Sequence, residues 1–106
     1  MTVSTHVLDT GLGRPAAEVP VRLDRYDGTT WQPLGEGATD ADGRWRAPSA
    51  DEPGTYRLRF GTGHYFAGRP SFYPEVMIVF VVADAAEHHH VPLLLSPYGY
   101  STYRGS

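Results

Sequence analysis

The sequence predicts an all-β fold, a sandwich of packed β-sheets. Glycine, proline and aspartate divide its 106 residues into short segments of β-like composition. Two Asp-Gly dipeptides, at positions 27–28 and 42–43, stand between such segments, and this arrangement is a good hairpin signal. Strand-like segments that recur at this spacing are typical of a sandwich. Because a chain of this length forms one ordinary domain, we expect a single domain over residues 1–106.

The turn residues separate eight expected strands and one short helix. "DTGLGRP" lies between the first two strands, and "YDGTT" leads from the second into the third. "DADGR" opens the fourth strand, "ADEPGT" leads into the fifth, and "LSPYG" separates the last two. The helix is expected within "TGHYFAGR", residues 62–69, where helix-forming residues stand between glycines. The expected strands are Thr2–Leu8, Val19–Tyr26, Thr30–Leu34, Arg44–Ala47, Thr55–Phe60, Glu75–Val82, Glu87–Leu95 and Tyr98–Tyr103.

Alternation of side chains along a strand separates a core face from an outer face. In "YRLRF" both arginines fall on one face, as expected for a strand with a solvated side. In "VMIVFVV", residues 76–82, and "VPLLL", residues 91–95, both faces are apolar, so we expect a second subunit to cover the outer one. The alternative, that bends or bulges bury both faces within one chain, stays open.

The same alternation sorts the histidines. In "HHHVPLLL" the core face takes the valine that follows the histidines, so His88 and His90 share the outer face and His89 does not. In "VSTHVLD" the valines point inward, and His6 points outward. A half-buried histidine near its ordinary pKa of about 6.5 is suited to general base catalysis near neutral pH.

Composition excludes several classes of function. Nine arginines are scattered, lysine is absent and the net charge is -3, so we expect no binding to nucleic acid or to an anionic membrane. Without cysteine there is no thiolate zinc site and no cysteine nucleophile. The longest apolar stretch is far shorter than the roughly 18 residues of a membrane span. The chain begins without a secretory signal and ends without a peroxisomal address, so we expect a cytoplasmic protein.

Three blocks in order, "STHVLD", "TDADGR" and "HHHVPLLLSPYGYSTYRGS", resemble the transthyretin-related 5-hydroxyisourate hydrolases of urate breakdown. The resemblance covers nearly the whole chain. It implies a transthyretin-like sandwich of two four-stranded sheets, with a short helix after the fifth strand and four subunits, a dimer of dimers, around a central channel. It also implies hydrolysis of 5-hydroxyisourate to 2-oxo-4-hydroxy-4-carboxy-5-ureidoimidazoline, without metal or other cofactor.

The resemblance also implies roles for particular residues. The last two histidines of the family usually flank an aromatic residue, where this chain has His89. Because position 89 faces away from position 90, we expect this departure to do little damage. The implied catalytic residues are His6, Arg44 and His90, and the implied substrate-binding residues are Tyr103, Arg104, Gly105 and Ser106.

The chemistry follows from these residue types. Hydrolysis of a cyclic amide-like bond needs an activated water, stabilisation of the developing oxyanion, and help for the departing nitrogen. We expect His6 or His90 to take the proton of water, with the choice between them open. We expect Arg44 to hold substrate oxygens and to keep a nearby imidazole neutral by repelling an added proton. The three side chains are expected to converge on a cleft that exists only once chains assemble.

Three alternatives stay open. A carrier with the same sandwich and channel would bind a small ligand without turnover. A zinc ion held by His88 and His90, with Glu87 or His6 nearby, is a second alternative, although two ligands alone do not make a site. A structural β-sandwich module is the third, and it predicts a monomer with polar outer faces. His64 is expected to be a loop or helix-start residue with no role in the chemistry.

Overall fold

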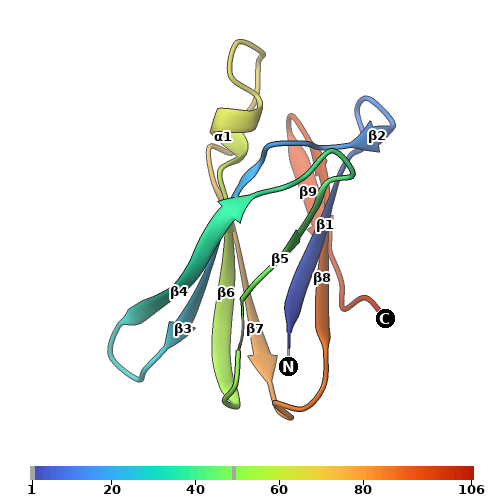
Figure 1. Ribbon diagram of the computed structural model, residues 1–106. Helices are drawn as coiled ribbons and strands as arrows, with labels where there is room; N and C mark the ends of the chain where they lie inside the picture. The colour runs from blue at the N-terminus through green and yellow to red at the C-terminus, as the bar shows by residue number, and fades with distance from the viewer. Residues whose placement is uncertain (1, 49) are drawn as a thin grey trace.

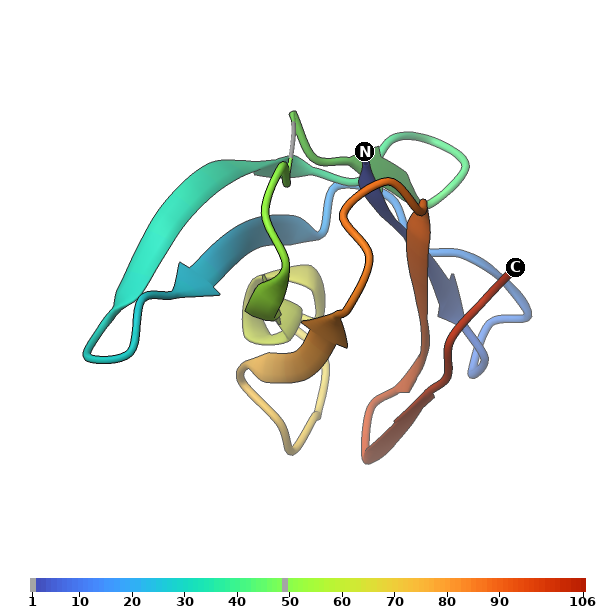
Figure 2. The same ribbon diagram turned by 90° about the horizontal axis from the view of Figure 1, so that it is seen from below.

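A computed structural model describes residues 2–48 and 50–106 of the chain (Figure 1). Nine strands and one short helix lie within these residues, and the strands form two sheets that pack face to face (Figures 1 and 2). In chain order the elements are β1 (Val3–Asp9), β2 (Arg14–Pro15), β3 (Pro20–Tyr26), β4 (Trp31–Ala38), β5 (Arg44–Arg46), β6 (Gly54–Phe60), α1 (Thr62–Tyr65), β7 (Val76–Val82), β8 (His89–Ser96) and β9 (Gly99–Thr102).

The predicted all-β sandwich is confirmed, and the order of strands shows how the chain builds it. The first sheet has the order β2-β1-β8-β9, with β5 also paired to β1, and the second has the order β4-β3-β6-β7. All neighbours are antiparallel except β1 and β8, which run parallel although they stand at opposite ends of the sequence. The first sheet has five strands where four were expected, because two residues of the "DTGLGRP" connection pair with β1 as β2.

The core lies between the sheets and follows the predicted alternation. Tyr56, Leu58 and Phe60 of β6 are fully buried, while the arginines between them face outward. On β1 and β8 the valines and alternate leucines that were assigned to the core are also buried. Each such apolar side chain contributes roughly 1.5–3 kcal/mol when it is removed from water. On β1 and β6, period-two alternation therefore decides which side chains remain outside.

Strand β4 continues past the point where the sequence predicted its end. The expected strand ended at Leu34, and the glycines at positions 35 and 37 follow it. A Cβ atom at Gly35 would lie 2.8 Å from Cδ of Pro48, and one at Gly37 would lie 2.5 Å from Nε1 of Trp45. Because these glycines have no side chains, β5 and the residues after it can pass close to β4. The glycines therefore permit a close approach of the backbone within a strand.

The predicted helix is confirmed but short. Helix α1 has four residues, Thr62–Tyr65, within the expected 62–69. The hydroxyl of Tyr65 donates a hydrogen bond to Oδ2 of Asp9 at 2.7 Å, which ties the helix to the end of β1. His64 lies exposed in this helix. No helix in the described part of the chain is long and apolar enough to cross a bilayer.

Strand β7 carries an apolar row on each face. Ile78 and Phe80 pack against the core. Met77, Val79 and Val81 on the other face are 50%, 58% and 69% exposed. No bend or bulge within the chain buries this outer row, so the alternative of burial within one chain is wrong for β7.

Candidate active site

The pairing of β1 with two neighbours brings the expected catalytic side chains to one face. His6 of β1 lies opposite Arg44 of β5 in the antiparallel register. In the parallel register with β8, Ser4 is level with His90. Because paired residues of neighbouring strands point to the same side of a sheet, all four side chains leave the outer face of the first sheet. The strand order brings them together from three separate parts of the sequence (Figure 1).

The turn before β5 positions the backbone of Arg44, the first residue of that strand. Gly43 has a φ of 76°, and a Cβ there would lie 2.3 Å from the carbonyl oxygen of Val7, so only glycine fits. Oδ1 of Asp40 accepts hydrogen bonds from the backbone N–H of Asp42 at 2.9 Å and of Arg44 at 3.0 Å. The Arg44 N–H lowers the pKa of Asp40, which keeps this carboxylate ionised beside the site.

His90 is half-buried at the start of β8, and its environment favours the neutral imidazole. Burial lowers its pKa from the ordinary value of 6.5, and positive charge at His88, Arg44 and His6 lowers it further. Nδ1 of His90 lies 2.8 Å from the hydroxyl oxygen of Ser4. His90 therefore keeps a free lone pair at neutral pH, as a general base requires.

A cleft of about 410 Å³ opens beside these residues. The hollow already lies within one chain, and the expectation that assembly completes the catalytic cleft stays a prediction. Parallel pairing of β1 with β8, together with the β5 turn, already supplies its walls. The residues around it include Ser4, Asp40, Arg44, His88, His90 and Ser106.

His6 stands differently in the site. It is half-buried between the strands that carry Arg44 and His90, and it does not line the cleft as the other two do. Its charge nevertheless acts on both Asp40 and His90, lowering the pKa of each. The three expected catalytic side chains are thus neighbours, with two at the cleft wall and His6 beside them.

The tail "YRGS" reaches the site through its last two residues. The backbone N–H of Gly105 donates to the carbonyl oxygen of His90 at 2.9 Å, in an isolated antiparallel bridge. A Cβ at Gly105 would lie 2.5 Å from Cδ2 of His90, so the glycine lets the tail lie against the imidazole ring. Ser106 then lines the cleft.

Comparison with known proteins follows the same lines as the geometry. A model of the HIUase/Transthyretin family matches residues 3–105. The chain belongs to this family. The 5-hydroxyisourate hydrolase of Salmonella dublin is 47% identical over 109 residues, which cover 98% of this chain and 80% of that protein.

Two solved structures of the HIUase/Transthyretin family superpose closely on the chain. The 5-hydroxyisourate hydrolase of Klebsiella pneumoniae has a TM-score of 0.87 at 42% identity, covering 99% of this chain and 98% of that one. Transthyretin from Sparus aurata has a TM-score of 0.89 at 27% identity, covering 97% of this chain and 95% of that one. Backbone similarity alone therefore does not separate an enzyme from transthyretin, and the side chains of the cleft must do so.

Tyr103 and Arg104, which the family resemblance assigned to substrate binding, do not line the cleft. Tyr103 is 59% exposed, and Arg104 forms an ion pair with Glu87 at 2.9 Å. Both line a second, largely apolar cavity of about 340 Å³, whose other lining residues include Phe80 of β7 and His90 of β8. His90 therefore lines both hollows, with Arg44 and Ser106 on one and Tyr103 and Arg104 on the other.

The zinc alternative has weak geometric support. Both ring nitrogens of His88 contact hydroxyl groups, those of Thr2 and Ser4. Within residues 2–48 and 50–106, no three histidine, aspartate or glutamate side chains gather in a way that could hold a metal ion. His89 is buried on the core side, where its Nδ1 lies 3.1 Å from the carbonyl oxygen of Glu87, so it takes no part in the cleft.

Sequence reasoning missed two residues of the site. Alternation puts Ser4 on the same outer face as His6 but gives it no role, because its contact with His90 depends on parallel pairing across 86 positions. Asp40 was read only as a turn residue. The available signal for Asp40 was its place four residues before Arg44, where a carboxylate can accept the backbone N–H groups of a tight turn.

Proposed function

We propose that the protein hydrolyses 5-hydroxyisourate to 2-oxo-4-hydroxy-4-carboxy-5-ureidoimidazoline, with His6, Arg44 and His90 as catalytic residues. The observation that carries the proposal is the convergence of His90, with its lowered pKa, and Arg44, without an ion-pair partner among the described residues, on one cleft. The relatives named 5-hydroxyisourate hydrolase support the same conclusion.

In this proposal His90 is the general base. Nε2 of His90 removes a proton from water as the water oxygen attacks the ring carbonyl carbon. Arg44 donates hydrogen bonds to the oxygen on which negative charge develops. When the carbon–nitrogen bond breaks, the departing nitrogen takes a proton from His6 or His90, and the ring opens. His6 is placed to supply or orient this proton because it lies between Arg44 and the strand of His90.

Ser106 completes the proposed substrate site. It lines the cleft beside His90, so its hydroxyl is placed to accept or donate a hydrogen bond to a polar ring substituent. Gly105 contributes by letting the tail lie close to the His90 ring. Tyr103 and Arg104 line the other cavity that His90 borders, and their contact with substrate stays a prediction. No covalent intermediate is proposed, since the chain has no cysteine nucleophile.

The test couples the protein to urate and urate oxidase and follows the ultraviolet decay of the newly formed 5-hydroxyisourate. We expect decay faster than in a control without protein. Decay at the control rate, together with saturable binding of a ring compound, would instead identify a carrier. His90→Ala is the matched variant because it removes the proposed base, and thermal melting checks that it is folded.

We also propose that four chains assemble as a dimer of dimers around a shared channel. The exposed row of Met77, Val79 and Val81 supports this, because contiguous apolar surface of this kind marks an interface. Strands β7 and β9 end their sheets with unpaired edges, which a second copy can extend.

Light scattering after size exclusion tests the assembly. We expect a mass four times the 11.7 kDa of one chain, and a smaller species for Val79→Glu. A wild-type monomer at micromolar concentration would contradict the proposal. The cytoplasmic location expected from the sequence stays a prediction.

A further inference from the structure

His88 has no role in the catalytic proposal, yet it is joined to His90 through one side chain. The hydroxyl oxygen of Ser4 lies 2.8 Å from Nδ1 of His90 and 2.9 Å from Nε2 of His88. The two rings are nearly parallel, with centroids 6.4 Å apart and an interplanar angle of 17°. The other nitrogen of His88, Nδ1, contacts the hydroxyl of Thr2. A chain of four polar side chains thus runs from the cleft to the exposed surface.

The hydrogen count of Ser4 limits how this chain can be arranged. A serine hydroxyl has one proton to donate and two lone pairs to accept with. If His88 accepts the Ser4 proton at Nε2, then Nδ1 of His90 must donate its proton to the Ser4 oxygen. If His90 accepts that proton instead, its own proton must sit on Nε2. The direction of the Ser4 hydroxyl therefore decides the tautomer of His90.

Arg44 favours the first arrangement. Its guanidinium lines the same cleft as His90, and its charge acts on the imidazole. A positive charge attracts the lone pair of Nε2 and repels an N–H at that position. Nε2 of His90 forms no hydrogen bond with any other described residue, so it is the nitrogen available to a bound molecule. His88 is exposed, and water can satisfy it in either tautomer.

We propose that His88, acting through the hydroxyl of Ser4, is a positioning residue that fixes His90 as the tautomer with its proton on Nδ1. The lone pair of Nε2 is then free before any ligand arrives. The proposal rests on the proposed function for its catalytic meaning, since a base must present a lone pair. The tautomer itself is a property of the free protein and is measurable without substrate.

The charged groups around His88 and His90 affect the protonation of both imidazole rings. They come from β1, from the turn before β5, from β5 itself, and from the segment before β8. The groups are His6, Asp40, Arg44, Arg46 and Glu87, the last of which is engaged by Arg104.

Nitrogen-15 NMR of histidine-labelled protein tests the tautomer directly, because protonated and unprotonated ring nitrogens differ widely in chemical shift. For wild type at a pH where His90 is neutral, we expect Nδ1 protonated and Nε2 unprotonated. In Ser4→Ala and His88→Ala we expect a mixture of tautomers. His90 found with its proton on Nε2 in wild type, or unchanged in both variants, would overturn the proposal.

Two conservative variants serve as matched controls. Ser4→Thr keeps the hydroxyl on a residue that suits a strand, and His88→Gln places an amide oxygen near the position of Nε2. Both should restore the wild-type tautomer. A His88→Gln protein that behaves like His88→Ala would show that an acceptor at this place is not sufficient, and would contradict the proposal. Thermal melting of all four variants checks that each is folded.

Turnover separates this inference from the proposed function. We expect Ser4→Ala and His88→Ala to lower kcat about tenfold with little change in KM, less than the loss of the base itself. Ser4→Thr and His88→Gln should stay near wild type. If wild type fails to hydrolyse 5-hydroxyisourate, the proposed function fails while the NMR result stands. If wild type is active and kcat is unchanged in both alanine variants, the positioning role fails alone.

Discussion

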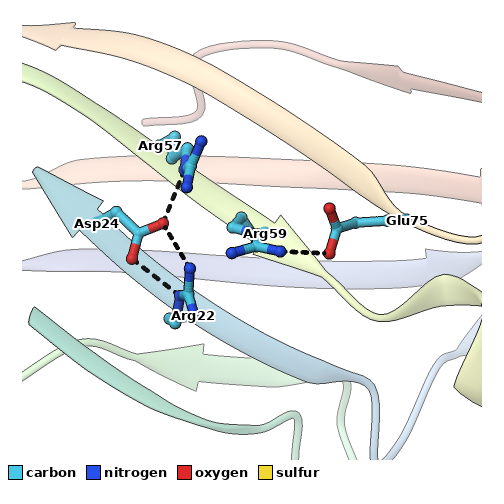
Figure 3. Close-up of polar contacts among 5 residues, drawn as sticks. All are labelled: Arg22, Asp24, Arg57, Arg59 and Glu75. Carbon is cyan, nitrogen blue, oxygen red and sulfur yellow. Dashed lines mark hydrogen bonds and ion pairs between the residues drawn. The ribbon is translucent and has the colours of Figure 1, made fainter. Parts of the chain in front are cut away.

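Both sheets carry arginines on their outer faces, but they differ in whether these arginines are paired with carboxylates. On the second sheet, Asp24 is fully buried beneath Arg22 and Arg57, with ion-pair distances of 2.9 and 2.7 Å (Figure 3). Beside them Arg59 pairs with Glu75 at 2.9 Å (Figure 3). On the first sheet, no described carboxylate lies within ion-pair distance of Arg44.

The difference arises from strand pairing. Asp24 and Arg57 are direct partners across β3 and β6, so opposite charges meet as soon as the sheet forms. The guanidinium of Arg57 also lies 4.4 Å from the centre of the Trp31 ring, which covers it further. On the first sheet the direct partner of Arg44 is His6, which gives no negative charge.

The comparison teaches where the molecule uses charge for stability and where it leaves charge for a ligand. A carboxylate buried between two arginines has its attraction satisfied within the fold, and water and solutes are excluded from it. An arginine that faces two imidazoles receives no counter-charge from them, so its hydrogen-bond donors remain available to substrate oxygens. The following predictions test this division, beginning with the largest expected effect.

Loss of the unpaired groups should affect turnover most. His6→Ala, Arg44→Ala and His90→Ala should each lower turnover by at least about a hundredfold, as expected when a general base or an oxyanion donor is removed. The measurement is the decay of freshly generated 5-hydroxyisourate. Arg59→Gln, on the paired face, is the control and should stay within about twofold of wild type. Near-normal turnover in all three alanine variants would break the comparison.

Loss of the buried carboxylate should affect stability and leave chemistry alone. Asp24→Asn leaves Arg22 and Arg57 without their counter-charge. Because both arginines are partly exposed, we expect a loss of about 2 kcal/mol in the free energy of unfolding, below the full cost of breaking a buried pair.

Urea denaturation measures the effect of Asp24→Asn. Glu75→Gln, in the more exposed pair with Arg59, is the control and should cost less than about 1 kcal/mol. Turnover per folded molecule should not change in either variant. A slower Asp24→Asn enzyme of normal stability would show that the two faces are not independent.

The contact of the tail with His90 gives the third effect. In Gly105→Ala the new methyl group would lie 2.5 Å from Cδ2 of His90, so the ring or the tail must move. We expect about tenfold lower kcat, since small misplacement of a reacting group is costly. The matched control is Gly99→Ala, where the new methyl group would meet only the Ser96 hydroxyl oxygen, at an ordinary contact distance of 3.7 Å. Equal turnover in both variants would show that the contact of the tail with His90 does not affect the site.

The smallest effect is on the pH dependence. Burial and neighbouring positive charge lower the pKa of His90 below 6.5, so activity should fall only at more acidic pH. Arg44→Gln removes one of these charges and should raise the pKa of His90. As the pH falls below 6.5, the unfolded chain takes up a proton before folded His90 does, so His90 lowers stability in that range. NMR titration of the imidazole gives the pKa, and a downward shift in the variant would contradict this account.

The sequence predicted the sandwich and the facing of each histidine because both depend on local alternation. Val91, Leu93 and Leu95 are buried as their pattern required, and His90 stays on the outer side. The placement of site residues around the cleft was less predictable. That Tyr103 and Arg104 lie in a different cavity depends on the path of the tail after β9, which no local pattern encodes.

Pairing between distant segments was the main feature that alternation left undetermined. The two-residue β2 and the crossing of β5 over Gly37 depend on contacts between parts of the chain far apart in sequence. The same is true of Ser4, whose partners are His88 and His90. Family resemblance supplied the catalytic assignment that composition could not.

The parallel pairing of β1 with β8 also has a consequence for how the protein is made. Bonds such as that from the Thr5 hydroxyl to the Val91 carbonyl join residues 86 positions apart, so forming this ladder closes most of the chain into one loop. Such high contact order slows folding, and because synthesis starts at the N-terminus, β1 has no parallel partner until β8 has been made. During that interval the strand β1, which forms one wall of the cleft, has been made, and β8, which forms the other, has not. We expect catalytic competence to be among the last properties that a newly made chain acquires.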